Sequence, residues 1–433
     1  MDDTPDVAVV GAGIAGLTAA RELRRRGLDV VVLERDDHSG GRIRSEHRPG
    51  VLLEHGGIFH THAYTSMRRL LAEHGLAEAA RPTATGFHAG VLRDGVFRHA
   101  DLGSVTGPLL TRLLGVRDKA SLLRVAGPML LARPADLGDL TSMRRFDTRS
   151  AAAGLSAATA GYLTAGPHEF LWGVPSTELS AAVFALQLHV FTGELREVSG
   201  GIGRLVAAVA GGTDVRHGTV VSAIRPEPDG VRVEVEGGDA LRARSVVLAC
   251  PADAAAGLWP DAPAPVRAHV RAMDHSRIDY VYLRTRRPVE LHAEGRPVGM
   301  EVITSPEVGG RTIGGIYGAN AWVDDGGMLL VTAARAARAE DLGDDELADR
   351  LQADVEKLHP EVVGEVTDRV VMRHQPYTPT FRPGSVRRLA EVRRHLPAGR
   401  VDLAGDHMSA PWVEGAIRSG EHAAARVGAA LRR

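Results

Sequence analysis

The chain has 433 residues, of which 44% are hydrophobic and 24% are charged, a composition typical of a globular protein and not of a fibrous or disordered one. The 52 Lys and Arg residues balance 54 Asp and Glu residues, so no basic excess favours nucleic-acid binding. The single cysteine, Cys250, excludes an intrachain disulfide and any multi-cysteine metal site, and we predict no metal centre. The acidic N-terminus and the lack of a long apolar run predict a cytoplasmic protein without a membrane span.

The first 34 residues follow the order strand, glycine turn, helix, strand, acid. Residues 7–10 form a short apolar run that predicts a buried parallel strand, and the glycine-rich hexapeptide 11–16 follows at once. Residues 17–26 have a helix-forming composition, and 28–33 predict a second strand that is closed by Glu34. This order is typical of the first βαβ unit of a dinucleotide-binding domain.

Each glycine of the hexapeptide has a physical task. Gly11 allows the tight turn, Gly13 lets the backbone approach a pyrophosphate, and Gly16 lets the helix pack closely on the strand. The start of the helix offers free N–H groups to phosphates. Glu34 can accept hydrogen bonds from both ribose hydroxyls. The candidate cofactor-binding residues of this segment are Gly11, Gly13, Ile14, Ala15, Gly16, Glu34 and Arg35.

Two further motifs accompany the first one. A second glycine turn with a cation, residues 40–42, follows Glu34 and can reach over the same pyrophosphate. Near the C-terminus, a predicted strand at 401–404 ends in Gly405-Asp406, and residues 414–416 (Glu-Gly-Ala) open a helix that runs to about Leu431. This series of motifs resembles the flavin-containing amine oxidoreductase superfamily, which includes monoamine and polyamine oxidases, protoporphyrinogen oxidases and phytoene desaturases.

The resemblance implies an α/β fold, with a Rossmann-like FAD-binding domain and an inserted α+β substrate domain, as in amine oxidases and p-hydroxybenzoate hydroxylase. It places the FAD-binding domain at 1–80, 199–273 and 373–433, and the substrate-binding domain at 81–198 and 274–372. FAD is therefore the expected cofactor.

The resemblance also assigns further residues to FAD. Asp406 would hold the ribityl or phosphate region, and the helix start at 414–416 would face the pyrimidine edge of the flavin ring, where a helix N-terminus stabilises negative charge. The backbone at 56–57 would pass the flavin, and that at 220–221 would meet the adenine. The additional cofactor candidates are Gly41, Arg42, Gly56, Gly57, Val221, Gly405, Asp406, Glu414, Gly415 and Ala416.

Three residues are candidates for the catalytic site. By resemblance, Tyr377 forms one wall of an aromatic cage in front of the flavin, and Trp412 falls where the opposite wall would stand. Two such ring faces can hold an amine or a flat unsaturated group. His60 follows the 56–57 glycine pair and is an acid–base candidate, because imidazole titrates near neutrality.

The chain departs from the family pattern in its lysines. Many amine oxidases place a lysine near flavin N5, where it assists reoxidation by oxygen. Residues 252–260 contain none, and the only two lysines are Lys119 and Lys357. The departure argues against fast use of oxygen and favours a desaturase or dehydrogenase with another electron acceptor.

These observations predict an FAD-dependent oxidoreductase that removes a hydride from a C–N bond of a small or mid-sized amine in a biosynthetic role. Two alternatives stay open: a desaturase or dehydrogenase acting on C–C bonds, and a redox-neutral isomerase or cyclase. The electron acceptor is oxygen or another compound, the substrate is a small molecule, and a homodimer is one alternative for the oligomeric state.

Overall fold

A computed structural model describes residues 4–304, 309–396 and 400–432. One layer is a five-stranded sheet in which every neighbouring pair of strands is parallel. Across the sheet the strands are β21 (Val401–Leu403), β13 (Ser245–Leu248), β1 (Val7–Val10), β2 (Val30–Leu33) and β9 (Asp214–Arg216). All residues of β1 and β2 are buried, which confirms the two predicted buried strands and explains their unbroken run of aliphatic side chains.

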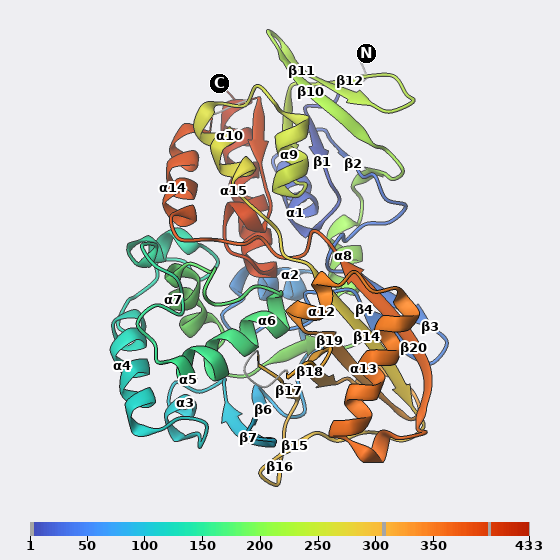
Figure 1. Ribbon diagram of the computed structural model, residues 1–433. Helices are drawn as coiled ribbons and strands as arrows, with labels where there is room; N and C mark the ends of the chain where they lie inside the picture. Colours follow the sequence, from blue (N-terminus) through green and yellow to red (C-terminus); the bar gives the residue numbers. More distant parts are fainter. Residues whose placement is uncertain (1–3, 305–308, 397–399, 433) are drawn as a thin grey trace.

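Two helices pack closely on the parallel sheet. They are α1 (Ile14–Arg24) and α15 (Val413–Ala430), which lie beside each other in the upper half of Figure 1. A Cβ atom at Gly420 of α15 would lie 2.3 Å from the carbonyl oxygen of Ala15, so glycine is required for the two helices to touch. Gly16 is equally close to the turn before α1, because its Cβ would lie 2.0 Å from the carbonyl oxygen of Gly11.

A second, seven-stranded sheet lies in the lower half of Figure 1, and all its neighbouring pairs are antiparallel except β17 with β6. In order, its strands are β20 (Val366–His374), β14 (Ile278–Thr285), β19 (Gly327–Ala333), β18 (Ile313–Gly318), β17 (Met300–Val302), β6 (His88–Arg93) and β7 (Val96–Asp101). Helix α13 (Asp344–Leu358) covers one face of this sheet, where Leu351 and Val355 join Val281 and Val331 in a separate apolar core.

Shorter elements complete the two layers. Strands β10 (Val221–Glu227), β11 (Gly230–Val235) and β12 (Leu241–Ala243) form an antiparallel sheet at the top of Figure 1. The two-stranded sheets pair β3 (Ser45–Arg48) with β4 (Val51–Glu54), β5 (Ala80–Pro82) with β8 (Arg196–Val198), and β15 (His292–Ala293) with β16 (Arg296–Pro297). The other helices are α2 (Thr65–Glu73), α3 (Gly107–Leu110), α4 (Val116–Leu130), α5 (Ala157–Thr159), α6 (Gly166–Trp172), α7 (Ala181–Val190), α8 (Gly203–Ala210), α9 (Ala252–Leu258), α10 (Ala264–Arg271), α12 (Arg335–Ala339) and α14 (Ser385–His395).

The architecture confirms the predicted α/β fold. The strands of the parallel sheet come from the segments 1–80, 199–273 and 373–433 that were assigned to FAD binding. Apart from the end of β20, the seven-stranded sheet comes from the segments 81–198 and 274–372. The division of the chain into two domains with these boundaries stays a prediction.

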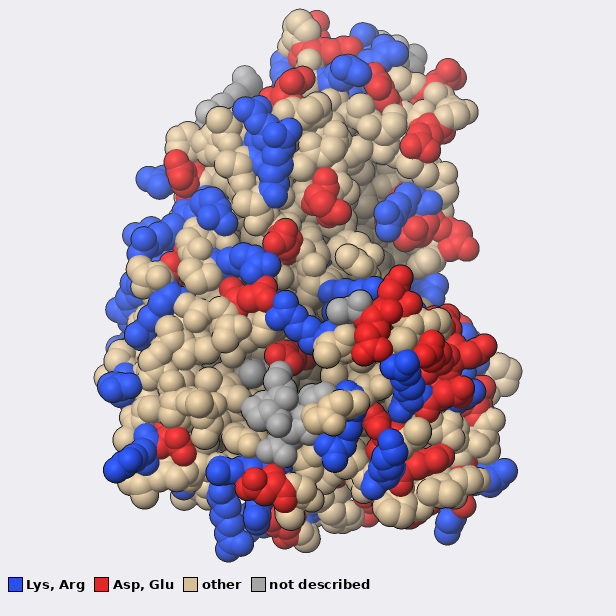
Figure 2. Space-filling model, in the orientation of Figure 1, with Lys and Arg blue, Asp and Glu red and all other residues tan. Residues whose placement is uncertain are grey.

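The face of the molecule shown in Figure 2 carries mixed charges. Acidic side chains gather at the lower right, over α13, whose first turn contains Asp344, Asp345 and Glu346. Within the described ranges, none of the helices has both the length and the apolar character that crossing a membrane requires. The same ranges contain no group of three or more His, Cys, Asp or Glu side chains arranged to hold a metal ion.

Candidate functional site

A cavity of about 870 Å³ extends from the edge of the parallel sheet to the seven-stranded sheet. Parallel strands end at the same edge, and four of these strand ends bring lining residues to the cavity: Gly11 follows β1, Glu34 follows β2, Ala249 follows β13 and Gly405 lies just beyond β21. In open α/β sheets ligands bind outside this carboxyl edge. The volume lies in the upper part of the range for ligand pockets.

The two glycine turns meet at this edge. Gly11 has a φ of +106°, and a Cβ there would lie 2.9 Å from the carbonyl oxygen of Ala249. A Cβ at Gly13 would meet nothing within 4 Å, so the open side of this residue is free to receive a ligand. Gly13 and Gly40 form a parallel bridge, and Gly41 lies next to them, since its Cβ would be 3.9 Å from the Cα of Gly13. The bare backbone forms a cradle that a pyrophosphate fits.

Glu34 is held rigidly beside this cradle. It is 8% exposed, and its carboxylate accepts hydrogen bonds from the backbone N–H groups of Ala12 at 2.6 Å and Asp36 at 3.0 Å. Each carboxylate oxygen retains a second lone pair, so the group can still accept from ribose hydroxyls. Arg35 lines the cavity next to it, and Val221 lines it from β10.

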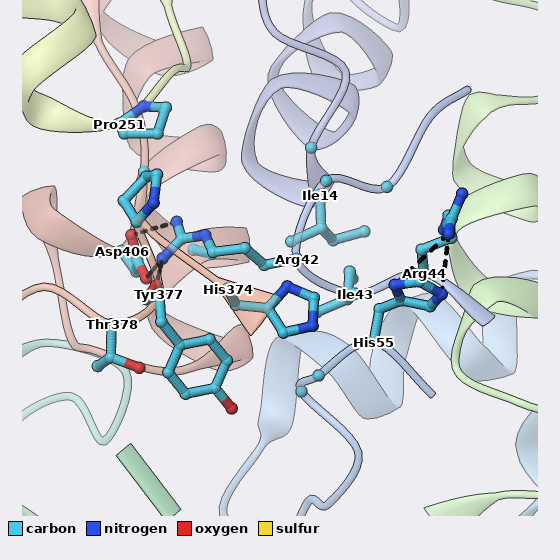
Figure 3. A pocket seen from close by; sticks show the side chains of 18 of the residues that line it. Ile14, Arg42, Ile43, Arg44, His55, Pro251, His374, Tyr377, Thr378 and Asp406 are labelled. Carbon is cyan, nitrogen blue, oxygen red and sulfur yellow. Dashed lines mark hydrogen bonds and ion pairs between the residues drawn. The ribbon is translucent and has the colours of Figure 1, made fainter. Parts of the chain in front are cut away.

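The half-buried Arg42 and the buried Asp406 form an ion pair on the cavity wall (Figure 3). The two guanidinium nitrogens of Arg42 donate to the two oxygens of Asp406 at 2.8 and 2.9 Å, and Arg42 also donates to the carbonyl oxygen of Tyr377. Burial alone would raise the pKa of Asp406, but the charge and hydrogen bonds of Arg42 outweigh it and hold this pKa below its usual range. The pair joins the second glycine turn to the end of β21.

Tyr377 and Trp412, the predicted walls of the cage, both line the cavity. Burial raises the pKa of Tyr377 to about 12, so its hydroxyl is protonated at neutral pH. Gly56 makes room for this ring, since a Cβ there would lie 3.3 Å from Tyr377 Cε2. Trp412 is 7% exposed, and its ring meets that of Phe191 edge-on with 5.7 Å between the ring centroids. The Nε1 atom of Trp412 has no hydrogen-bond partner among the described residues.

The start of α15 contributes one residue to the cavity and another to the cap of a neighbouring helix. Ala416 lines the cavity, but Glu414 does not. The carboxylate of Glu414 instead accepts hydrogen bonds from the backbone N–H groups of Ser66 at 2.8 Å and Met67 at 2.9 Å, and thereby caps α2. Gly415 packs against the chain before it, because its Cβ would lie 2.2 Å from the carbonyl oxygen of Ala410. Any contact of Glu414 or Gly415 with a cofactor would therefore be made by the backbone.

His60 lies outside the cavity lining, and its ring is 6.4 Å from that of Tyr64, which does line the cavity. Burial, reinforced by the charges of Arg196 and Arg68, lowers the pKa of His60 to about 4. His60 is therefore neutral near pH 7 and does not line the cavity, so its position does not support the predicted acid–base role.

The structure adds residues that no motif indicated. His374 lines the cavity, accepts or donates a hydrogen bond with the Tyr280 hydroxyl at 3.1 Å, and lies 6.0 Å from the ring of Tyr377. Burial is the main reason that the pKa of His374 falls to about 4. Eight further lining residues that no motif indicated are aromatic: Phe59, Tyr64, Phe87, Phe170, Trp172, Phe191, Tyr280 and Tyr317. They are scattered singly along a chain with only 4% aromatic residues, so no local pattern in the sequence marked them as a group.

Residues 14–428 match the family model described as flavin containing amine oxidoreductase. The chain belongs to this family. Membership confirms the predicted cofactor, FAD, and the predicted enzyme class, an oxidoreductase of the amine oxidase type. The glycine cradle, Glu34 and the Arg42–Asp406 pair fit a dinucleotide of this kind.

Individual relatives share parts of the sequence or the whole fold. Protoporphyrinogen oxidase 2 of Arabidopsis thaliana is 39% identical over 90 residues, which is 21% of this chain and only 18% of that protein. Among solved structures, cyclohexylamine oxidase from Brevibacterium oxydans superposes with a TM-score of 0.77 at 20% identity, over 99% of this chain and all of that one. Putrescine oxidase bound to putrescine gives a TM-score of 0.76 at 22% identity, over 98% of both chains. At these identities the superpositions show a shared fold.

Proposed function

We propose that the protein oxidises an amine by removing a hydride from the carbon of a C–N bond. The observation that carries this proposal is one cavity that is lined both by the glycine cradle and by Tyr377 and Trp412. FAD, when bound, supplies a ring that accepts two electrons and a proton as a hydride equivalent.

The chain's own residues would hold, orient and shield the reactants. The cradle around Gly13 and the carboxylate of Glu34 would hold the pyrophosphate and a ribose. Arg42, already paired with Asp406, fixes the turn on the opposite side of the cradle. The rings of Tyr377 and Trp412 would position the amine and exclude water, which favours the uncharged amine whose lone pair assists loss of the hydride.

A second candidate is oxidation of a C–C bond with an electron acceptor other than oxygen. It is favoured by the lysines, because neither Lys119 nor Lys357 lines the cavity. Lys357 instead pairs with Asp354 at 3.2 Å on α13. A cytoplasmic location and a homodimer remain predictions from the sequence.

Anaerobic mixing of the flavin-loaded enzyme with candidate amines tests the proposal. Bleaching of the oxidised-flavin absorbance by amines supports it, and bleaching only by saturated carbon substrates supports the second candidate. Turnover without net bleaching would support a redox-neutral reaction. The variants Tyr377→Ala and Trp412→Ala should slow bleaching by about 10-fold or more, while Tyr377→Phe, which keeps the ring, should be nearly unaffected. Unchanged bleaching in both alanine variants would show that the cage assignment is wrong.

A further inference from the structure

The cavity is unusually aromatic for this chain. The sequence contains 4 Trp, 6 Tyr and 8 Phe, and ten of these rings line the cavity. The segments 81–198 and 274–372 supply eleven lining residues, none of which is charged. Six of the eleven are aromatic: Phe87, Phe170, Trp172, Phe191, Tyr280 and Tyr317. The wall that would face a substrate is therefore apolar and built from flat rings.

The acidic residues that line the cavity belong to other parts of it. Glu34 and Asp36 follow β2 beside the glycine cradle, and Glu236 lies next to the β10 segment expected to meet the adenine. Asp406 is neutralised by Arg42. Among the described residues, no other Asp or Glu lines the cavity, so none is available to pair with a cation held among the aromatic rings.

A neighbouring cavity does not change this conclusion. It has a volume of about 250 Å³ and shares Phe170 and Thr332 with the large one. Glu169 lines it, but Arg335 and Arg338 line it too, and the charge of Glu169 acts on that of Arg338. The positive charges of Arg335 and Arg338 therefore compensate the negative charge of Glu169.

The chemistry of this wall limits the substrate. A buried ammonium that lacks a carboxylate partner is strongly disfavoured. Cation–π contacts with ring faces offset only part of the free-energy cost of burying the ammonium. A monoamine avoids the cost by binding as its free base, whereas a diamine or polyamine must also bury its second charged end or deprotonate it. Flat or cyclic apolar groups gain the most from an aromatic wall.

We propose that the substrate is a monoamine with an aromatic or alicyclic body, bound as the neutral free base, and that diamines and polyamines are rejected. The inference rests on the proposed amine oxidation. It separates this chain from a diamine-binding relative of the same fold such as putrescine oxidase.

A matched pair of ligands tests this inference in the flavin-loaded enzyme. Benzylamine and 4-(aminomethyl)benzylamine share one ring and differ in a second ammonium, and 4-methylbenzylamine controls for size. Binding is measured by quenching of tryptophan fluorescence, since Trp172 and Trp412 line the cavity, and anaerobic bleaching of the flavin is recorded alongside. We expect the diamine to bind at least 100-fold more weakly than either monoamine. Equal binding of all three ligands would overturn the inference.

An introduced charge provides the second arm. Leu330 lines the cavity on β19 and is uncharged. Leu330→Glu should reduce the ratio of monoamine affinity to diamine affinity at least 10-fold. Leu330→Gln, which has the same size without the charge, should leave this ratio unchanged. An equal change in both variants would refute the role of charge. If Leu330→Glu fails to retain flavin, the affinities of the monoamines and the diamine for the wild-type enzyme still test the inference.

The pH dependence gives an independent readout. His374 is neutral between pH 6 and 9, because its pKa is lowered to about 4, and Tyr377 is protonated, because its pKa is raised to about 12. Burial also lowers the pKa of His55, whose ring lies edge-on to that of His374. Glu54 lies outside the lining but accepts a hydrogen bond from Tyr280 through its carbonyl oxygen, and burial raises its pKa to about 7, so the pH dependence is measured in Glu54→Gln as well as in the wild type. Burial raises the pKa values of Tyr64, Tyr280 and Tyr317 as well, and Arg373 pairs with Asp344 and Asp279. Monoamine affinity should therefore rise about 10-fold per pH unit below the amine's own pKa.

Affinity that does not change with pH would overturn binding as the free base. Failure of the proposed function looks different. If no amine bleaches the flavin, amine oxidation is wrong, while the binding ratio of the ligand pair still tests the rejection of a second charge.

Discussion

Replacing Glu54 by glutamine should remove a pH dependence from the stability of this protein. Glu54 is 3% exposed at the end of β4, and its carboxyl group accepts hydrogen bonds from the Ile202 N–H at 2.8 Å and from the Ser45 hydroxyl at 2.6 Å. These two bonds favour the ionised form, but burial outweighs them and raises the pKa of Glu54 from 4.5 to about 7. The folded protein therefore holds a proton on this group over a range in which the unfolded chain has released it.

The sign and size of the effect follow from that difference. Below pH 4.5 the group is protonated in both states and contributes no pH dependence. Between pH 4.5 and 7 the folded state binds more protons, so stability falls by about 1.4 kcal/mol per pH unit. The loss reaches about 3 kcal/mol and stays constant at higher pH. Glutamine resembles the protonated form and does not titrate, so Glu54→Gln should be free of this loss.

Thermal unfolding of the two proteins from pH 4.5 to 8 measures the difference. About 3 kcal/mol corresponds to roughly 3–6 °C in a chain of this length, so the wild type should lose that much relative to Glu54→Gln as the pH rises. The control is Glu46→Gln, because Arg48 and His55 lower the pKa of Glu46, although burial opposes this. The stability of the wild type relative to Glu46→Gln should change only slightly with pH and in the opposite direction, since Glu46 is partly exposed. Parallel curves for wild type and Glu54→Gln would refute the reasoning.

Four other variants test the cofactor site and the helices beside it. Arg42→Met removes the charged partner of the buried carboxylate of Asp406, which keeps a hydrogen bond from the His407 N–H. It should lower stability by about 1–3 kcal/mol and weaken FAD retention, as measured by thermal unfolding and FAD titration. Normal FAD affinity would contradict the role of the pair. Gly13→Ala should leave the apoprotein stable, because the added Cβ meets nothing within 4 Å, yet it should reduce FAD affinity at least 10-fold. Gly16→Ala should destabilise the apoprotein itself, because the added Cβ would lie 2.0 Å from a carbonyl oxygen. Glu414→Gln weakens the cap on α2 and should lower the melting temperature at a cost of about 1–2 kcal/mol while the rate of flavin reduction stays within 2-fold; a large loss of rate would mean that Glu414 acts on the cofactor directly.

Sequence reasoning identified residues that line the sheet edge of the cavity, because the signals there are local. The turn after β1 requires a residue that tolerates the φ of +106° at Gly11, and the end of β2 places Glu34 one residue beyond a buried strand. Both features are fixed by neighbours in the chain, so a short motif reveals them. Arg42 and Asp406 were each predicted to contact the cofactor, but their ion pair joins residues more than 360 positions apart and was visible only in the structure.

The role of Glu414 shows the same limit. The motif at 414–416 correctly indicated the start of a helix, and α15 begins at Val413. Which way the side chain points depends on α2, which packs against α15, and there the carboxylate caps backbone N–H groups. His60 likewise follows a glycine pair that lines the cavity, yet its own ring is buried outside it.

The sequence by itself determined the family, the parallel sheet and the cofactor, because strand, turn and helix signals depend on residues close together in the chain. Only the tertiary structure decided the aromatic character of the cavity wall. Its rings come from α6, β14, β18 and the connecting segments, where each aromatic residue stands alone in the sequence. Long-range packing brings them to one surface, and no local pattern of residues encodes that meeting.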